Sequence, residues 1–240
     1  MKRWFLCLWL LAAPAAAAYH YSAGPAHMQM DSVNAHLNAA HQMAEDEIWG
    51  PAVQHFQQAL DNLPAEAIQQ QREVRLELAT AKMKASQLPE SHAELKTLLD
   101  EILQDPNRDP AFEVRVRESM ASAQFYMTWL MRLEGATREE WEPEIESARQ
   151  NFRILAEQAA ALGTDADKVA MKQKENLEAS IRLARMEISD LQGMPLPRQC
   201  KGCCSGKCAS RKPGKPKEGQ KSPKDARGAS AGEPADGSGS

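Results

Sequence analysis

Apolar residues recur at helical spacing along most of this chain. Leu, Ala, Met and Ile fill positions three or four residues apart, while the strict apolar–polar alternation that is typical of a half-buried strand is absent. Gly, Pro and capping residues divide this pattern into seven predicted helices, at about residues 31–49, 51–63, 65–85, 90–103, 110–134, 137–162 and 164–193. The predicted fold class is all-α, with antiparallel helical pairs joined by short turns within residues 31–194 and a final unpaired helix.

Two of the predicted helix starts carry specific capping signals. Asp109 precedes Pro110, and proline suits the first position of a helix because the N–H that it lacks would have no acceptor there. Thr137 and Glu140 have the spacing of a capping box, in which each side chain accepts a hydrogen bond from the backbone of the other residue. These signals predict helix starts near residues 110 and 137.

One predicted helix carries a spacing that is known from helical repeats. Ala52, Phe56, Ala59 and Pro64 stand at offsets 0, 4, 7 and 12, so a small, an aromatic and a second small residue share one stripe before proline ends the helix. This pattern resembles the second helix of a tetratricopeptide repeat (TPR), and residues 33–66 are similar to one degenerate unit. The resemblance implies a right-handed stack of helix pairs whose concave face binds a protein or peptide partner.

The echoes of this pattern elsewhere are partial. Leu98 and Pro106 repeat the last interval, and Ala148 and Phe152 repeat the first. However, the large residues Phe56, Leu98 and Phe152 lie 42 and 54 residues apart, whereas a regular TPR has a period of roughly 34. A plain helical bundle is therefore the alternative architecture.

Residues 1–18 have the pattern of a signal peptide. Two basic residues, Lys2 and Arg3, precede an apolar run that is too short to span a bilayer comfortably, and an alanine run that ends at Ala18 offers small residues to signal peptidase. We expect cleavage near Ala18, a flexible lead-in at residues 19–30, and a mature protein that is periplasmic or secreted. The alternative is an N-terminal membrane anchor. No later segment is apolar enough to be a transmembrane segment.

Charge divides the mature chain into an acidic body and a basic tail. Residues 19–195 hold 17 Lys and Arg against 29 Asp and Glu, a balance of −12, whereas residues 196–240 hold 10 against 4, a balance of +6. Residues 211–240 are rich in Lys, Pro, Gly and Ser, which predicts a disordered tail. Its spaced lysines allow weak polyanion contact, but it has no aromatic residue to stack on a base, which argues against sequence-specific nucleic-acid binding.

All four cysteines of the predicted mature chain lie in a Cys-rich segment at residues 195–210. Cys200, Cys203, Cys204 and Cys208 fall within nine residues, and three chemistries fit this spacing. Four thiolates can bind one zinc or copper(I) ion, two disulfides can form in an oxidising compartment, and exposed thiols can cross-link copies of the protein or a partner. The segment lacks the two well-separated Cys-x-x-Cys pairs of a strong zinc site, so all three hypotheses stay open.

Histidine and methionine are concentrated in the N-terminal part of the predicted body. In an exported protein these residues together can bind copper, but His36 and His41 are five residues apart and so lie about 140° apart around one helix. We expect the histidines to occupy exposed helix faces and the methionines to lie in the core. The group comprises His27, Met28, Met30, His36, His41, Met43 and His55.

No catalytic signature accompanies these patterns. The sequence has no Gly-rich phosphate loop, no nucleophile elbow and no His-Glu-x-x-His zinc helix, so we expect a protein that is not an enzyme and needs no cofactor. The first hypothesis is an exported, non-enzymatic protein–protein interaction scaffold with a TPR-like helical body. The alternative is a periplasmic metal-binding protein that holds zinc or copper in the C-terminal cysteine cluster.

Overall fold

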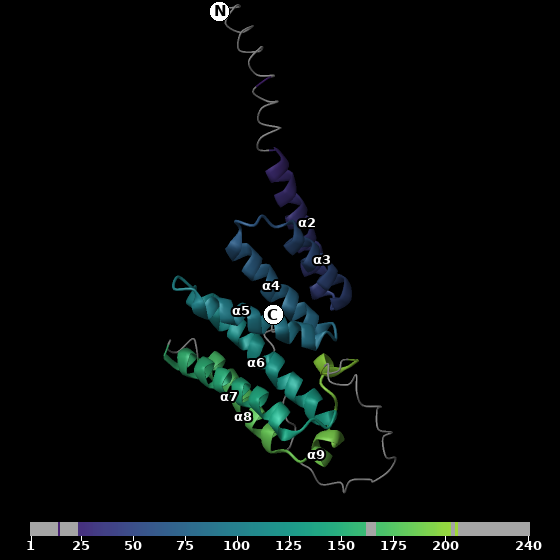
Figure 1. Ribbon diagram of the computed structural model, residues 1–240, viewed down its shortest axis with the longest axis vertical. Coiled ribbons are helices and arrows are strands. Elements are labelled where there is room, and N and C mark those ends of the chain that lie inside the picture. The colour runs from purple at the N-terminus through teal and green to yellow at the C-terminus, as the bar shows by residue number, and fades with distance from the viewer. Residues whose placement is uncertain (1–13, 15–23, 162–166, 203–204, 206–240) are drawn as a thin grey trace, which may run out of the picture. The chain divides into compact units, whose positions relative to one another are not determined.

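The fold is helical throughout the part of the chain that the computed structural model describes, which is Pro14, residues 24–161, residues 167–202 and Ser205. These ranges contain eight α-helices, one short 3-10 helix and no strand (Figure 1). The predicted all-α class with helices packed in consecutive pairs is confirmed, while the predicted number of seven helices is wrong. The helices are α2 (Gly24–Glu45), α3 (Trp49–Asn62), α4 (Ile68–Lys84), α5 (Leu88–Gln104), α6 (Pro110–Leu133), α7 (Arg138–Ala161), α8 (Asp167–Arg185), α9 (Ile188–Gly193) and η2 (Arg198–Cys200).

Two of the predicted segments fall largely outside the described residues. The predicted signal peptide at residues 1–18 lies outside them except for Pro14, and the predicted disordered tail at residues 211–240 lies outside them entirely. The chain divides into two compact units, Met1–Leu78 and Ala79–Ser240, with the boundary inside α4.

Helices α2 and α3 of the first unit pack against each other as an antiparallel pair (Figure 1). The side-chain amide of Gln29 donates to the carbonyl oxygen of Asn62 at 2.7 Å, and His36 lies against His55. Later positions on α2 therefore meet earlier positions on α3, as antiparallel packing requires. The apolar core beside them consists of the buried residues Val33, Ala59, Leu63 and Val74, with Met30, Leu37, Leu60 and Ala67 partly buried against it.

Helix α2 begins at Gly24 rather than at residue 31. Residues 24–30 of the predicted flexible lead-in are therefore helical. The physical reason is tertiary contact, because Met30 packs against the core of the first unit and Gln29 bonds to the end of α3. Such contacts stabilise a helical turn that the local sequence does not predict.

The turn between α2 and α3 comes earlier than predicted. Helix α2 ends at Glu45 rather than near residue 49, because Glu47 adopts a left-handed conformation with φ of 57°. The backbone N–H of Ile48 donates to the carbonyl oxygen of Met43 at 2.7 Å and closes the turn. Helix α3 then begins at Trp49.

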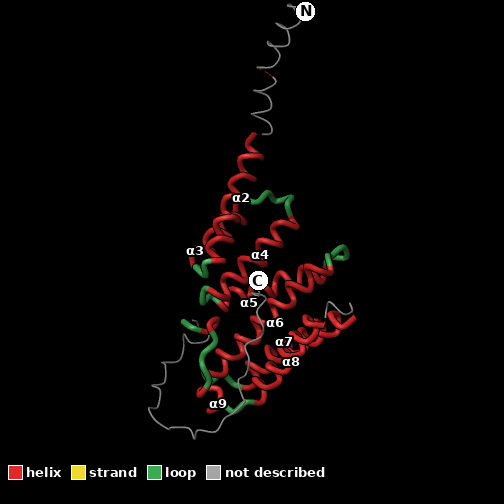
Figure 2. The backbone as a smooth tube through the Cα atoms, turned by 180° about the vertical axis from the view of Figure 1, so that it is seen from behind, coloured by secondary structure: helices red, strands yellow, loops and turns green. Residues whose placement is uncertain are grey.

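Helix α6 is the central element of the second unit. Figures 1 and 2 show α5, α6, α7 and α8 side by side in chain order, and α6 also contacts α9 and η2. Residues 123–132 of α6 are buried at every position. A helix that is covered on all sides is typical of the centre of a helical bundle.

Both predicted capping signals make hydrogen bonds at helix starts, one at the start of α6 and one at the start of α7. The side chain of Asp109 accepts a hydrogen bond from the backbone N–H of Ala111 at 3.0 Å, and Pro110 is the first residue of α6. The carboxylate of Glu140 accepts from the backbone N–H of Thr137 at 2.8 Å, which is one half of a capping box at the start of α7. Local sequence is enough to set these two helix starts.

The predicted final helix at residues 164–193 is interrupted and forms α8 and α9. The guanidinium of Arg132 on α6 donates to the carbonyl oxygens of Leu183 and Met186. In a continuous helix those oxygens would accept from backbone N–H groups four residues further on. Glu187 is instead extended, with ψ of 150°, and precedes the first residue of α9. The side chain of Arg132, from a helix that is distant in the sequence, therefore stabilises the break between α8 and α9.

Candidate functional site

Three of the four residues that carry the resemblance to a TPR unit lie in the core of the first unit. Ala52, Phe56 and Ala59 are buried on α3. The ring of Phe56 lies edge-on to that of His41 on α2, with 5.4 Å between the ring centroids. Pro64 follows the end of α3 and is half-buried. Nothing in the structure identifies a TPR repeat, so the family resemblance stays a prediction.

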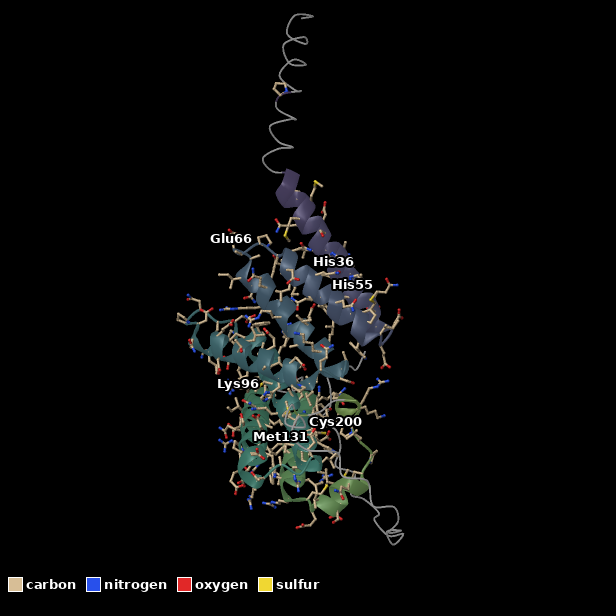
Figure 3. All side chains as sticks on the ribbon, turned by 45° about the vertical axis from the view of Figure 1, so that its right-hand side comes forward. His36, His55, Glu66, Lys96, Met131 and Cys200 are labelled. Atoms are coloured by element: carbon tan, nitrogen blue, oxygen red, sulfur yellow. The ribbon has the colours of Figure 1, made fainter. Side chains whose placement is uncertain are left out.

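The α2–α3 pair brings two imidazoles together (Figure 3). The Nδ1 atoms of His36 and His55 are 3.3 Å apart, the ring centroids are 5.5 Å apart, and the ring planes are inclined by 34°. Both residues are half-buried. Helical spacing shows how His36 lies relative to other residues of its own helix, such as His41. Its contact with His55 depends instead on how α2 pairs with α3, so the sequence alone does not predict it. The predicted antiparallel pairing of these two helices was the signal that could have indicated the contact.

The remaining histidines and methionines of the N-terminal group are dispersed. His27 and His41 are exposed, as expected, and Nε2 of His41 lies 2.9 Å from a carboxylate oxygen of Glu77. The expectation of exposed histidines is wrong for the half-buried His36 and His55. The expectation of buried methionines is wrong for Met28, which is 67% exposed. The members of the group therefore differ in burial and in the residues that they contact.

A buried polar network joins α6 to α7 in the second unit. Arg117 donates to Asn151 at 2.9 Å and to Glu113 at 2.7 Å, and the Asn151 amide donates to Gln124 at 3.1 Å. Burial alone would raise the pKa of Glu113, but hydrogen bonds from Arg117 and Arg108 outweigh it and hold that pKa below its usual value. Because these groups bond to one another, the network is a cross-link between helices.

A second polar contact joins α5 to α7. Nε2 of His92 lies 2.9 Å from Oε2 of Glu144, and their side chains are 14% and 27% exposed. The hydrogen bond from His92 lowers the pKa of Glu144; burial opposes this effect, and a hydrogen bond from Gln124 adds to it. A His–carboxylate pair also orients the general base in some catalytic triads. Here the pair links α5 to α7, both of which pack against α6.

The buried side of α8 is unusually polar. Gln173, Asn176 and Ser180 are each no more than 2% exposed. The Gln173 amide donates to Glu118 of α6 at 2.9 Å, and the Ser180 hydroxyl donates to the Asn176 carbonyl oxygen at 2.9 Å. Met171 on the same helix is 60% exposed. The bond from Gln173 to α6, together with bonds among these residues within α8, offsets the cost of burying their polar groups.

The start of the Cys-rich segment is docked on the second unit. Cys200 is buried, and its Sγ lies 3.7 Å from the carbonyl oxygen of Tyr126 on α6. The hydroxyl of Ser86 donates to the carbonyl oxygen of Lys201 at 2.5 Å. Gly202 follows with φ of +70°, a conformation that favours glycine.

Ser205, which follows the undescribed residues 203–204, provides a second anchor on the same unit. Both the backbone N–H and the hydroxyl of Ser205 donate to the carboxylate of Glu134, the former at 2.9 Å. Cys203, Cys204 and Cys208 lie outside the described residues. The predicted metal or disulfide role of the cluster therefore stays a prediction.

Within the described ranges, no three His, Cys, Asp or Glu side chains come together in a group that could hold a metal ion. No helix in the same ranges has both the length and the apolar content needed to cross a bilayer.

Comparisons with protein-family models, with curated proteins and with solved structures found no match for this chain.

Proposed function

We propose that this chain is an exported, non-enzymatic scaffold that binds a protein or peptide partner on its helical surface. The observation that best supports this function is the α2–α3 pair, in which Phe56, Ala52 and Ala59 are buried beside an antiparallel neighbour. The spacing of these residues in the sequence resembles that of a TPR unit, and arrays of such units bind partners on the surfaces of stacked helices. Export is proposed from the signal-peptide pattern of residues 1–18.

Exposed apolar side chains are the first positions at which to test for partner contact. Met28 and Ile68 in the first unit are 67% and 58% exposed, and Met171 in the second unit is 60% exposed. Complete burial of a side chain of this size against a partner contributes about 1.5–3 kcal/mol. A few such residues are enough to anchor a protein interface.

Site-specific photo-cross-linking tests the scaffold function directly. A photoreactive amino acid replaces Met28, Ile68 or Met171 in the full chain, which is expressed in the cells that naturally produce it. Glu139, which is exposed and charged, is the matched control position. We expect one defined adduct from at least one apolar position, and we expect it to persist when residues 211–240 are deleted. If no apolar position gives more adduct than Glu139, the scaffold proposal loses its support.

A second candidate function is zinc or copper binding by the cysteine cluster. What favours it is the docking of Cys200 and the nearby Ser205, because anchors on the folded body lower the entropy cost of forming a site. Native mass spectrometry of the reduced chain with zinc and copper(I) is the test. We expect one ion per chain, lost in Cys203→Ser and kept in Ser210→Ala. Two intact disulfides and no metal in freshly isolated protein would contradict this function.

A further inference from the structure

His36 and His55 face each other through the same type of ring nitrogen. Their Nδ1 atoms are 3.3 Å apart, one from α2 and one from α3 (Figure 3). A neutral imidazole nitrogen without a proton carries a lone pair, and two such lone pairs repel at this distance. The pair therefore needs either a proton or a cation between the two nitrogens.

The distance between the two nitrogens suits a shared metal ion. Imidazole nitrogens bind zinc at about 2.0–2.1 Å, so two nitrogens 3.3 Å apart would subtend roughly 105–110° at the ion, close to the tetrahedral angle. We propose that His36 and His55 bind one divalent transition-metal ion through their Nδ1 atoms. This site does not depend on the cysteine cluster or on the proposed scaffold function.

The packing of α2 on α3 holds the two imidazoles in place. His55 lies between Ala52 and Ala59 on α3, and Ala40 follows His36 by one turn of α2; all three alanines are 0% exposed. Small side chains at a helix–helix contact allow the two backbones to approach closely. The hydrogen bond from Gln29 to the Asn62 carbonyl oxygen fixes the register of the pair further along. The two ligands are thus positioned before an ion binds.

The donor set defines the class of ion. Imidazole favours copper(II), nickel(II) and zinc(II), and among divalent ions copper(II) binds most tightly to a given nitrogen site. Two protein ligands leave at least two coordination positions for water or for a group from another molecule. Because His36 and His55 are both half-buried rather than sealed in the core, an ion from solvent can reach them.

Metal titration of the full mature chain, with its reactive thiols alkylated, tests this site. His36→Gln and His55→Gln each remove one ligand. His27→Gln is the matched control, because it removes an exposed imidazole from the same helix. We expect copper(II) and nickel(II) to raise the Tm of the parent chain by about 3–5 °C for each ten-fold excess of ion over its Kd. Loss of either ligand should weaken binding at least ten-fold, and the control should bind as the parent chain does.

Electron paramagnetic resonance of the parent chain with one equivalent of copper(II) keeps the proposal testable if a glutamine variant fails to fold. Chains labelled with ¹⁵N-histidine should show coupling of the ion to two histidine nitrogens. Coupling to fewer than two, or equal affinity in the parent and both folded variants, would overturn the proposal. In that case a proton joins the two imidazoles as an ordinary hydrogen bond.

Discussion

The guanidinium of Arg132 lies over the indole ring of Trp141, with 4.9 Å between its Cζ atom and the ring centroid. The same guanidinium donates hydrogen bonds to the carbonyl oxygens of Leu183 and Met186. One side chain of α6 thereby contacts the start of α7 and the end of α8. Burial lowers the pKa of this guanidinium, and the nearby carboxylate of Glu187 opposes that shift. Arginine suits this position because its planar fork can stack on a ring and donate to two acceptors at once.

Replacement of this arginine should destabilise the second unit. Arg132→Met leaves the carbonyl oxygens of Leu183 and Met186 without their donor, and we expect a loss of about 2–4 kcal/mol in the free energy of unfolding. Arg132→Lys should recover only part of this free energy, because the ammonium group of lysine lacks the planar guanidinium that stacks on a ring and donates to two acceptors at once. Urea denaturation followed by circular dichroism measures both. Arg138→Met, which removes an exposed surface ion pair, is the control and should leave the midpoint unchanged; equal effects in the two methionine variants would contradict this role.

Acid should weaken the fold through Glu144. The hydrogen bond from His92 lowers the pKa of Glu144 in the folded chain below its unfolded value of about 4.5. As the pH falls below 4.5, the unfolded chain therefore takes up the proton first. The stabilisation from this carboxylate is fully present above about pH 4.5 and is lost as the pH falls through the lower folded pKa. The same sign holds for Glu113, where hydrogen bonds from Arg117 and Arg108 outweigh burial.

Glu144→Gln tests this pH dependence. The substitution should cost about 1 kcal/mol at pH 7, because a neutral amide accepts a weaker hydrogen bond from His92. It should also make the fall in stability below pH 4.5 shallower than in the parent chain. Chemical denaturation between pH 3 and pH 7 measures both effects. Glu139→Gln, at an exposed position, should keep the parent slope, and an unchanged slope in Glu144→Gln would show that this carboxylate does not carry the acid sensitivity.

Features that depend on a few neighbouring residues were predictable from the sequence. The cap at Asp109 and the proline after it form as their spacing predicts, and Thr137 and Glu140 form one half of the predicted capping box. Helix class was predictable for the same reason, since apolar periodicity is a local property.

Features set by distant contacts were not predictable. The break between α8 and α9 depends on Arg132, which lies more than fifty residues earlier in the chain. The early start of α2 depends on the packing of Met30 and on the bond from Gln29 to α3. The paired imidazoles of His36 and His55 likewise require the register between two helices. In each case tertiary contact, rather than local preference, decides the outcome.

The anchor of the Cys-rich segment at Glu134 can be tested by proteolysis. Its carboxylate accepts two hydrogen bonds from Ser205, and Glu134→Ala removes both. If together they contribute about 1 kcal/mol, loss of the anchor should speed tryptic cleavage after the exposed Lys201 by about five-fold. Cleavage is followed by mass spectrometry under native conditions. Glu139→Ala is the control, and equal rates in the two variants would show that Ser205 does not restrain this segment.

Phe56 should dominate the stability of the α2–α3 pair. Its side chain is 3% exposed and lies edge-on to His41 of α2. Phe56→Ala deletes a buried aromatic ring, which typically costs about 3–5 kcal/mol. The described core cluster beside this pair contains four buried residues and no second aromatic ring that could fill the cavity, so we expect amide hydrogens in α2 and α3 to exchange at least 100-fold faster than in the parent chain. Hydrogen exchange read by mass spectrometry gives this ratio for each helix.

The control variant is Ile48→Ala, which removes a side chain that is 49% exposed in the adjoining turn. It should change the exchange rate by less than about three-fold. Similar protection in both variants would mean that the small-aromatic-small stripe does not hold this helix pair together.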